Sequence, residues 1–224
     1  MVISSDLDLQ VLFQRTVGTE IGVLIARLGV ATNTYGFYVN LANNTTNTIN
    51  YRWSPTGASA GLISKSSTGT FPMPTGTPVW VRVTHDVDNG ASGNDVRFYR
   101  GVYNGTANPP TTWTQVGSTV TTAGTTSIFN PTTQGASVGS YWSGGFGGLT
   151  AGARIYRGIV KDGIDGPIVV DINPTKRPPF VFGSLLFLDD LSTTVPLNNI
   201  LGDISGGVAY AKTRVTASGR VSAP

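Results

Sequence analysis

Short runs in which apolar and polar residues alternate constrain this chain more than any other feature. In the first run, Leu7, Leu9, Val11 and Phe13 alternate with Asp6, Asp8 and Gln10. The same period recurs in Tyr35–Leu41, Ile49–Trp53, Val79–Thr84, Val96–Tyr99 and Ile155–Val160. A period of two places every second side chain on one face of a β-strand, so Ile155 and Ile159, for example, are expected on the same face.

Each run ends in residues that favour tight turns: Asn43-Asn44, Pro55-Thr56-Gly57, Asp88-Asn89-Gly90, Asn104-Gly105 and Gly144-Gly145. No stretch keeps a helical apolar period for more than about two turns. Many short strands separated by turns are typical of sandwiches and jelly rolls. The sequence therefore predicts an all-β fold, a two-sheet antiparallel jelly-roll sandwich of the concanavalin A-like type with a C-terminal extension.

The composition changes at Asn173-Pro174-Thr175-Lys176-Arg177-Pro178-Pro179, where paired prolines are unsuited to a helix or a central strand. We expect a sandwich over residues 1–172 and a separate segment over residues 173–224. The runs Phe180–Phe182 and Leu185–Leu188 are too apolar to stay in solvent. The segment either completes the sandwich or acts as an arm that docks on another chain.

Charged residues make up only 12% of the chain, and its polar surface must come from Thr, Ser, Asn and Gly. The net charge is +3 and the cations are scattered, so a nucleic-acid partner is not expected. The chain has no cysteine, and its apolar runs are too short to span a membrane. No signal peptide is visible, which together with the surface-type composition favours a protein released by cell lysis, such as a virion protein.

Acid–base chemistry has few candidate residues. Glycoside hydrolases of this fold use two facing carboxylates, usually glutamates, and Glu20 is the only glutamate. His85 is the only histidine, and although Asp86 follows it, no nucleophile elbow is present. We expect a strand-end packing role for His85. The sequence predicts that the protein is not an enzyme.

Two groups of residues are candidates for binding. Asp86, Asp88 and Asp95 crowd carboxylates around one loop, as calcium sites do, although the same residues also suit an ordinary hairpin turn. Trp53, Tyr141 and Trp142 are candidate platforms for stacking on sugars. Trp53 shares a face with Ile49 and Tyr51, which equally fits a place in the core. Calcium is the one candidate cofactor.

Several stretches carry a family resemblance in this order: Pro78–Tyr99, Thr112–Gly117, Ala123–Phe129, Ala153–Arg157 and Lys161–Gly166. Together they resemble the laminin-G-like, concanavalin A-like jelly-roll modules of minor tail, capsid decoration and other virion proteins from phages of actinobacteria. The resemblance covers about residues 6–172. The family's extra strand before Asp6–Leu9 is missing, and the segment after Pro174 does not match. The resemblance implies a structural or adhesive role, in a fold that often binds glycans and sometimes calcium.

The leading functional prediction is a non-enzymatic phage structural protein located in the virion, on the capsid surface as decoration or on the tail. Its expected partners are other virion proteins and copies of itself. The alternative is a lectin-like carbohydrate-binding module that adsorbs to host or environmental glycans. The two predictions are compatible, and they differ in whether the isolated chain binds glycans.

Overall fold

The computed structural model describes residues 6–16, 22–29, 34–43, 47–132, 135–142, 146–148 and 153–173, with the pairs 214–215 and 221–222. This part of the chain contains β-strands and one short 3-10 helix, η1 (Ser59–Gly61), and no α-helix. The predicted all-β class, with two antiparallel sheets, is confirmed. Within the described residues there is no helix long and apolar enough to span a membrane.

Sheet A has the strand order β14 (Ile168–Ile172), β13 (Arg154–Asp162), β1 (Leu7–Gln14), β6 (Pro78–Asp86), β7 (Gly93–Val102) and β8 (Thr114–Gln115), and β9 (Val120–Ala123) also pairs with β7. Its strands pair antiparallel throughout. Strand β1 lies between β13 and β6, neither of which is its neighbour in sequence. Such connections between distant strands are typical of a jelly roll.

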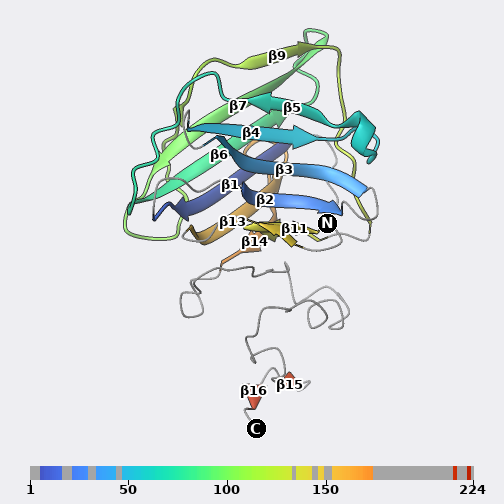
Figure 1. Ribbon diagram of the computed structural model, residues 1–224. Coiled ribbons are helices and arrows are strands. Elements are labelled where there is room, and N and C mark those ends of the chain that lie inside the picture. The colour runs from blue at the N-terminus through green and yellow to red at the C-terminus, as the bar shows by residue number, and fades with distance from the viewer. Residues whose placement is uncertain are drawn as a thin grey trace. The chain divides into compact units, whose positions relative to one another are not determined.

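Sheet B has the order β12 (Phe146–Gly148), β11 (Ser140–Trp142), β2 (Gly22–Gly29), β3 (Thr34–Asn43), β4 (Thr48–Trp53) and β5 (Ile63–Ser66), and β10 (Ser137–Val138) also pairs with β2. These strands pair antiparallel, except for one parallel contact between β11 and β2. Figure 1 shows β2, β3, β4 and β5 side by side in one layer, with β1, β6 and β7 in the other.

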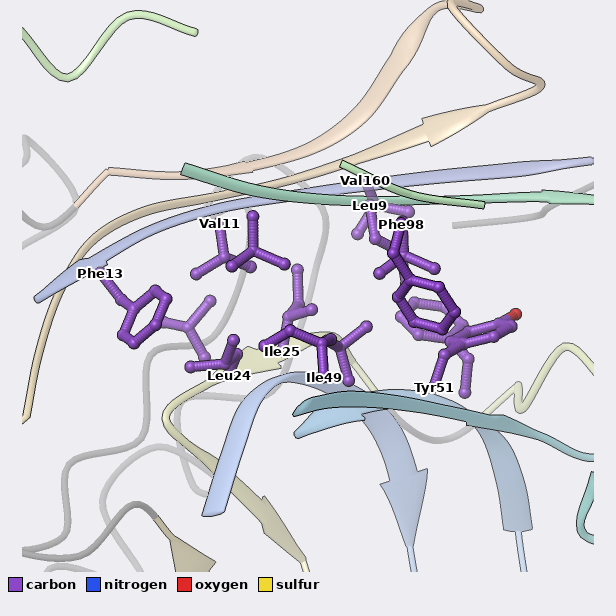
Figure 2. Close-up of a cluster of buried hydrophobic side chains, with 14 of the residues drawn as sticks. Leu9, Val11, Phe13, Leu24, Ile25, Ile49, Tyr51, Phe98 and Val160 are labelled. Carbon is purple, nitrogen blue, oxygen red and sulfur yellow. The ribbon is translucent and has the colours of Figure 1, made fainter. Parts of the chain in front are cut away.

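The main core lies between the two sheets. Figure 2 shows Leu9, Val11 and Phe13 pointing from sheet A toward Leu24 and Ile49 of sheet B. Each of these side chains is at most 1% exposed, and burying one fully stabilises the fold by about 1.5–3 kcal/mol. The alternation in the sequence predicted this inward row on β1, because the odd-numbered residues share one face of the strand.

Bulges break the alternation where sequence alone predicts that it continues. The pairing of β1 with β13 shifts between Leu12 and Phe13, so that Phe13 lies opposite Ile155 while Gln10 lies opposite Ile159. Ile155 therefore joins the main core, whereas Ile159 packs on the opposite face of the sheet. The prediction that the two isoleucines share a face is wrong, because a bulge inserts an extra residue and reverses the sides of all that follow.

The chain divides into two compact units, Met1–Asp190 and Leu191–Pro224. In the second unit, the described residues form one antiparallel pair, β15 (Arg214–Val215) with β16 (Val221–Ser222). The boundary predicted after residue 172 stays a prediction, because residues 174–213, including both apolar runs of the extension, lie outside the described residues.

Candidate functional site

The outer face of sheet A, turned away from sheet B, carries a second set of buried side chains. Strand β1 contributes Asp8, Gln10 and Leu12 to this face, and β6 contributes Trp80 and Arg82. Their neighbours on the flanking strands are Tyr99 of β7, opposite Arg82, and Ile159 and Lys161 of β13, opposite Gln10 and Asp8. A face with buried charges and two kinds of aromatic residue differs from the polar, solvated outer face that an antiparallel sheet usually has.

Arg82 is the centre of a charged network on this face. Its Nε donates to Asp8 Oδ1 at 3.0 Å and its Nη2 to Asp8 Oδ2 at 2.8 Å, a bidentate pair in which the Asp8 side chain has no exposed surface. The same Nη2 also donates to Asp165 Oδ1 at 2.7 Å. Lys161 Nζ lies 3.8 Å from an oxygen of each carboxylate. The bidentate fork fixes the orientation of the guanidinium plane.

Two aromatic rings lie against this guanidinium. The Arg82 Cζ atom is 5.5 Å from the ring centroid of Tyr99 and 5.5 Å from that of Trp113. Both distances are within the range of a cation–π contact. Both aromatic residues remain partly exposed, while Arg82 is only 7% exposed. We call Arg82, Asp8, Asp165, Lys161, Tyr99 and Trp113 the Arg82 platform: two partly exposed rings supported by a buried, ion-paired cation.

The loop between β7 and β8, residues 103–113, positions Trp113. Trp113 meets Trp80 edge to face at 6.2 Å between centroids. Gly101 allows the loop to approach β7, because a Cβ there would lie 2.5 Å from Pro110 Cγ and 3.0 Å from the Trp113 ring. Arg157 of β13 donates from Nη1 to the Ala107 carbonyl at 3.0 Å. This hydrogen bond joins the loop to β13, which is separated from β7 by β1 and β6. The loop thus makes a small second core with Leu12, Trp80 and Ile159.

Asp165 is positioned by the turn between β13 and β14. It adopts a φ of +57°, a left-handed conformation that Asp and Asn tolerate better than most residues. Its backbone N–H donates to Asp8 Oδ2 at 3.3 Å. Gly166 passes so close to the Asp162 carbonyl that a Cβ would lie 1.9 Å from its oxygen. This tight turn holds the Asp165 carboxylate beside Arg82 while leaving 71% of the side chain exposed.

Two polar atoms beneath the platform are buried without a hydrogen-bond partner: Gln10 Oε1 and Trp80 Nε1. Gln10 is 2% exposed and its Nε2 donates to Asp8, while Trp80 has no exposed surface and contacts Trp113. One atom is an acceptor and the other a donor. Both residues belong to the outer face of sheet A, Gln10 on β1 and Trp80 on β6.

Trp53 is not part of a surface site. It is 1% exposed and lies between the sheets, stacked on Tyr51 with centroids 5.3 Å apart. The prediction of Trp53 as a sugar platform is therefore corrected to a core role, the other role that its position beside Ile49 and Tyr51 suggested. The side chains of Tyr141 and Trp142 lie outside the described residues, although their backbone forms strand β11.

His85 packs in the same part of the core. Its Nδ1 is 3.1 Å from the Tyr51 hydroxyl, and its ring lies 4.3 Å from that of Trp53. Burial lowers the pKa of His85 to about 4, although a hydrogen bond with Asn94 acts in the opposite direction. Burial also raises the pKa of the Tyr51 phenol well above its usual value. An enclosed, neutral imidazole with no exposed surface cannot reach a substrate.

The loop carboxylates do not form a metal site. The described residues contain no group of three His, Cys, Asp or Glu side chains that could hold a metal ion. Asp95 is occupied by Arg97, Thr121 and Asn89, and Asp88 accepts from the Gly90 N–H at 3.1 Å. The predicted calcium site of Asp86, Asp88 and Asp95 is thus wrong in its geometry, and the hairpin alternative fits, because Asx side chains close such turns.

The sequence signal for the Arg82 platform was present but ambiguous. The alternation around Val79–Val83 places Trp80 and Arg82 on the face opposite the core, and a tryptophan is unusual on a solvated face. The alternation does not show which residues form ion pairs with Arg82. Asp165 lies 83 residues from Arg82 along the chain and reaches it only through the pairing of β13 with β1.

No protein-family model and no curated protein matches the sequence. Solved structures that are similar to it include two of the CBM40 carbohydrate-binding module of Ruminococcus gnavus IT-sialidase. The module bound to alpha2,3 sialyllactose has 12% sequence identity and a TM-score of 0.42, covering 68% of this chain and 76% of that chain. A second structure of the module has 14% identity and a TM-score of 0.39 with the same coverage. At this level the likeness carries no conclusion about ligand or activity.

Proposed function

We propose that this protein is a non-catalytic glycan-binding module whose binding surface is the Arg82 platform. One observation carries the proposal: Tyr99 and Trp113 are both partly exposed and both held against a single buried guanidinium. Sugar-binding surfaces need rigid aromatic faces, which stack on the apolar faces of pyranose rings. The Asp8–Arg82 fork supplies that rigidity, because it restricts the cation against which both rings pack.

Polar groups beside the rings suit sugar hydroxyls. Asp165 exposes most of its carboxylate next to Arg82, and Lys161 lies beside it. Asp165 Oδ2, which has no partner in the Arg82 contact, offers an acceptor at the edge of the stacking surface. A few placed polar groups around an apolar surface are what fixes the orientation of a bound sugar.

The residues on the platform do not suit hydrolysis. A glycosidase needs one carboxyl that gives up a proton and another that acts as base or nucleophile. Both oxygens of Asp8 are bound by Arg82, and Asp165 shares the same guanidinium. His85 is enclosed between the sheets, and Glu20 lies outside the described residues. We infer that the protein binds its ligand without transforming it.

An array of printed glycans, followed by calorimetric titration of the best ligand, tests the proposal. We expect Trp113→Ala and Tyr99→Ala each to weaken binding about two- to tenfold, since one stacking contact contributes about 0.5–1.5 kcal/mol. Thr114→Ala is the matched control, because Thr114 is exposed and adjacent but outside the platform. Tyr99 is not in the second core, so its variant separates lost stacking from lost folding if Trp113→Ala proves unstable. An array that stays blank for the folded protein refutes the proposal.

We propose further that the module is presented on a phage particle, on the capsid or tail. This placement is supported by the sequence resemblance and by the low-charge, Thr- and Asn-rich composition. Mass spectrometry of purified particles, followed by localisation of the chain in a particle map, is the experiment. Absence of the chain from particles that are otherwise complete would overturn the placement and leave the glycan proposal unaffected.

A further inference from the structure

The charges of the Arg82 platform cancel. Two cations, Arg82 and Lys161, face two carboxylates, Asp8 and Asp165, and the contacts that join them range from 2.7 to 3.8 Å. The formal charge of the group is therefore zero. A surface that captures an acidic ligand normally presents an unneutralised cation, because a carboxylate gains little from a cation that is already paired.

Most hydrogen-bond donors of Arg82 are also engaged. Nε and Nη2 make three hydrogen bonds to the two carboxylates, and Cζ lies 5.5 Å from the ring centroids of Tyr99 and Trp113. Asp8 occupies the Nε/Nη2 edge, one of the two-pronged edges by which a guanidinium recognises a carboxylate, and Asp165 binds Nη2, which the Nη1/Nη2 edge would also need. The most exposed charged group of the platform is instead the Asp165 carboxylate, which accepts hydrogen bonds and repels anions.

The other arginines of this face do not change the balance. Arg97 is paired with Asp95 at 2.7 Å, and Arg157 with Asp171 at 2.6 Å. Arg154 is exposed and lies opposite Gln14, at the far end of β1 from Asp8. Six residues of extended strand separate those ends by about 20 Å, which is well beyond the screening length at physiological salt.

We propose that the platform selects neutral, hydroxyl-bearing sugars and discriminates against acidic ones, an inference that rests on the proposed function. Stacking on Tyr99 and Trp113 supplies the contact area for a pyranose ring. Asp165 accepts hydrogen bonds from hydroxyl groups, which an uncharged sugar offers. A sialic or uronic acid would place its carboxylate near Asp165 with no free cation to compensate.

Asp165→Asn is the decisive variant. It leaves the platform with one net positive charge, and asparagine keeps an acceptor oxygen and tolerates the left-handed φ of +57°. Asp88→Asn is the matched control, since it makes the same change in total charge in a loop outside the platform and keeps the acceptor for the Gly90 N–H. Urea unfolding of both variants verifies that the fold is retained.

The test titrates the full chain with two matched pairs of sugars, in addition to the glycan array. The first pair is lactose and sialyllactose, and the second is galactotriose and trigalacturonate. We expect the unaltered protein to bind the neutral member of a pair more tightly. Asp165→Asn should improve binding of the acidic member about threefold or more at low salt, an effect that salt removes, while Asp88→Asn should not.

The outcomes separate the two proposals. Binding of neither neutral nor acidic glycans overturns the proposed function and this inference with it. Glycan binding with a preference for the acidic member overturns the inference alone. An equal gain in Asp165→Asn and Asp88→Asn also overturns it, because the selectivity would then follow total charge and not the platform.

Discussion

Acidification below pH 6.5 should destabilise this protein through the buried imidazole of His85. The imidazole has no exposed surface and packs among Tyr51, Trp53 and Asn94. Burial lowers its pKa from 6.5 to about 4. Because the folded pKa lies below the unfolded one, the unfolded chain binds the proton more readily. The stability is therefore intact above pH 6.5 and is lost progressively as the pH falls from 6.5 to 4.

The size of the effect follows from the two pKa values. The interval between 6.5 and about 4, at about 1.36 kcal/mol for each pKa unit, corresponds to a loss of about 3 kcal/mol in the free energy of unfolding. A domain of ordinary stability has only about 5–15 kcal/mol in total, so the loss should be plain in an unfolding curve.

The pKa values of two aspartates are shifted in opposite directions. Burial raises the pKa of Asp86 above 3.8, and the charges of Asp6 and Asp95 add to this, so protonation of Asp86 favours the folded state as the pH falls through that range. Burial acts to raise the pKa of Asp95, but hydrogen bonds from Thr121 and Asn89 and the charge of Arg97 outweigh it. The pKa is lowered, and the stability that Asp95 provides is lost below pH 3.8. Most of the His85 window therefore lies above the range where Asp95 acts.

Urea unfolding at a series of pH values between 7.5 and 4, followed by circular dichroism, measures the effect. His85→Gln is the reference variant, because glutamine is polar and does not titrate in this range. The variant will have its own stability at pH 7, so the comparison concerns the slope with pH. If the wild type and His85→Gln lose equal stability between pH 6.5 and 4, the reasoning about the buried imidazole is refuted.

The charged network and the loop packing give two further predictions. Asp8→Ala should lower the free energy of unfolding by about 3–5 kcal/mol, measured by urea titration, because it leaves Arg82 buried with only one exposed carboxylate partner; a loss below about 1 kcal/mol would contradict this. Gly101→Ala should displace the β7–β8 loop, because its Cβ would lie 2.5 Å from Pro110 Cγ. The variant should lose more free energy of glycan binding than free energy of unfolding. Increased hydrogen exchange in residues 103–113 would report the displacement, and unchanged exchange would contradict it.

The sandwich could be predicted from the sequence because local pattern and burial agree over most strands. The inward row from Leu7 to Phe13 and the row from Val79 to Val83 follow from alternation alone, and both are buried between the sheets. The hairpin turn could also be predicted from the sequence, because Asp88 and Asn89 close it by accepting hydrogen bonds from the backbone N–H groups of Gly90 and Ala91. Each of these features depends on residues that are neighbours in the chain.

The site was harder to predict because aromatic and acidic side chains have the same sequence signature in a core and on a surface. Trp53 and Trp113 both follow threonine- and turn-rich stretches, yet Trp53 is enclosed beside Tyr51 while Trp113 is partly exposed beside Arg82. The three loop aspartates have the composition of a calcium site, but two of them already accept hydrogen bonds: Asp95 from Arg97 and Thr121, and Asp88 from the Gly90 N–H. Composition gives the ligand types, whereas geometry decides whether they converge.

By itself the sequence determined that the chain forms alternating strands, which faces of β1 and β6 are apolar, and that few residues could support acid–base catalysis. The tertiary structure alone decided that Ile155 and Ile159 lie on opposite faces and that Asp8, Arg82 and Asp165 meet. The reason is physical: strand register and bulges are fixed by pairing between segments far apart in the chain, and no local period records which distant residue lies opposite.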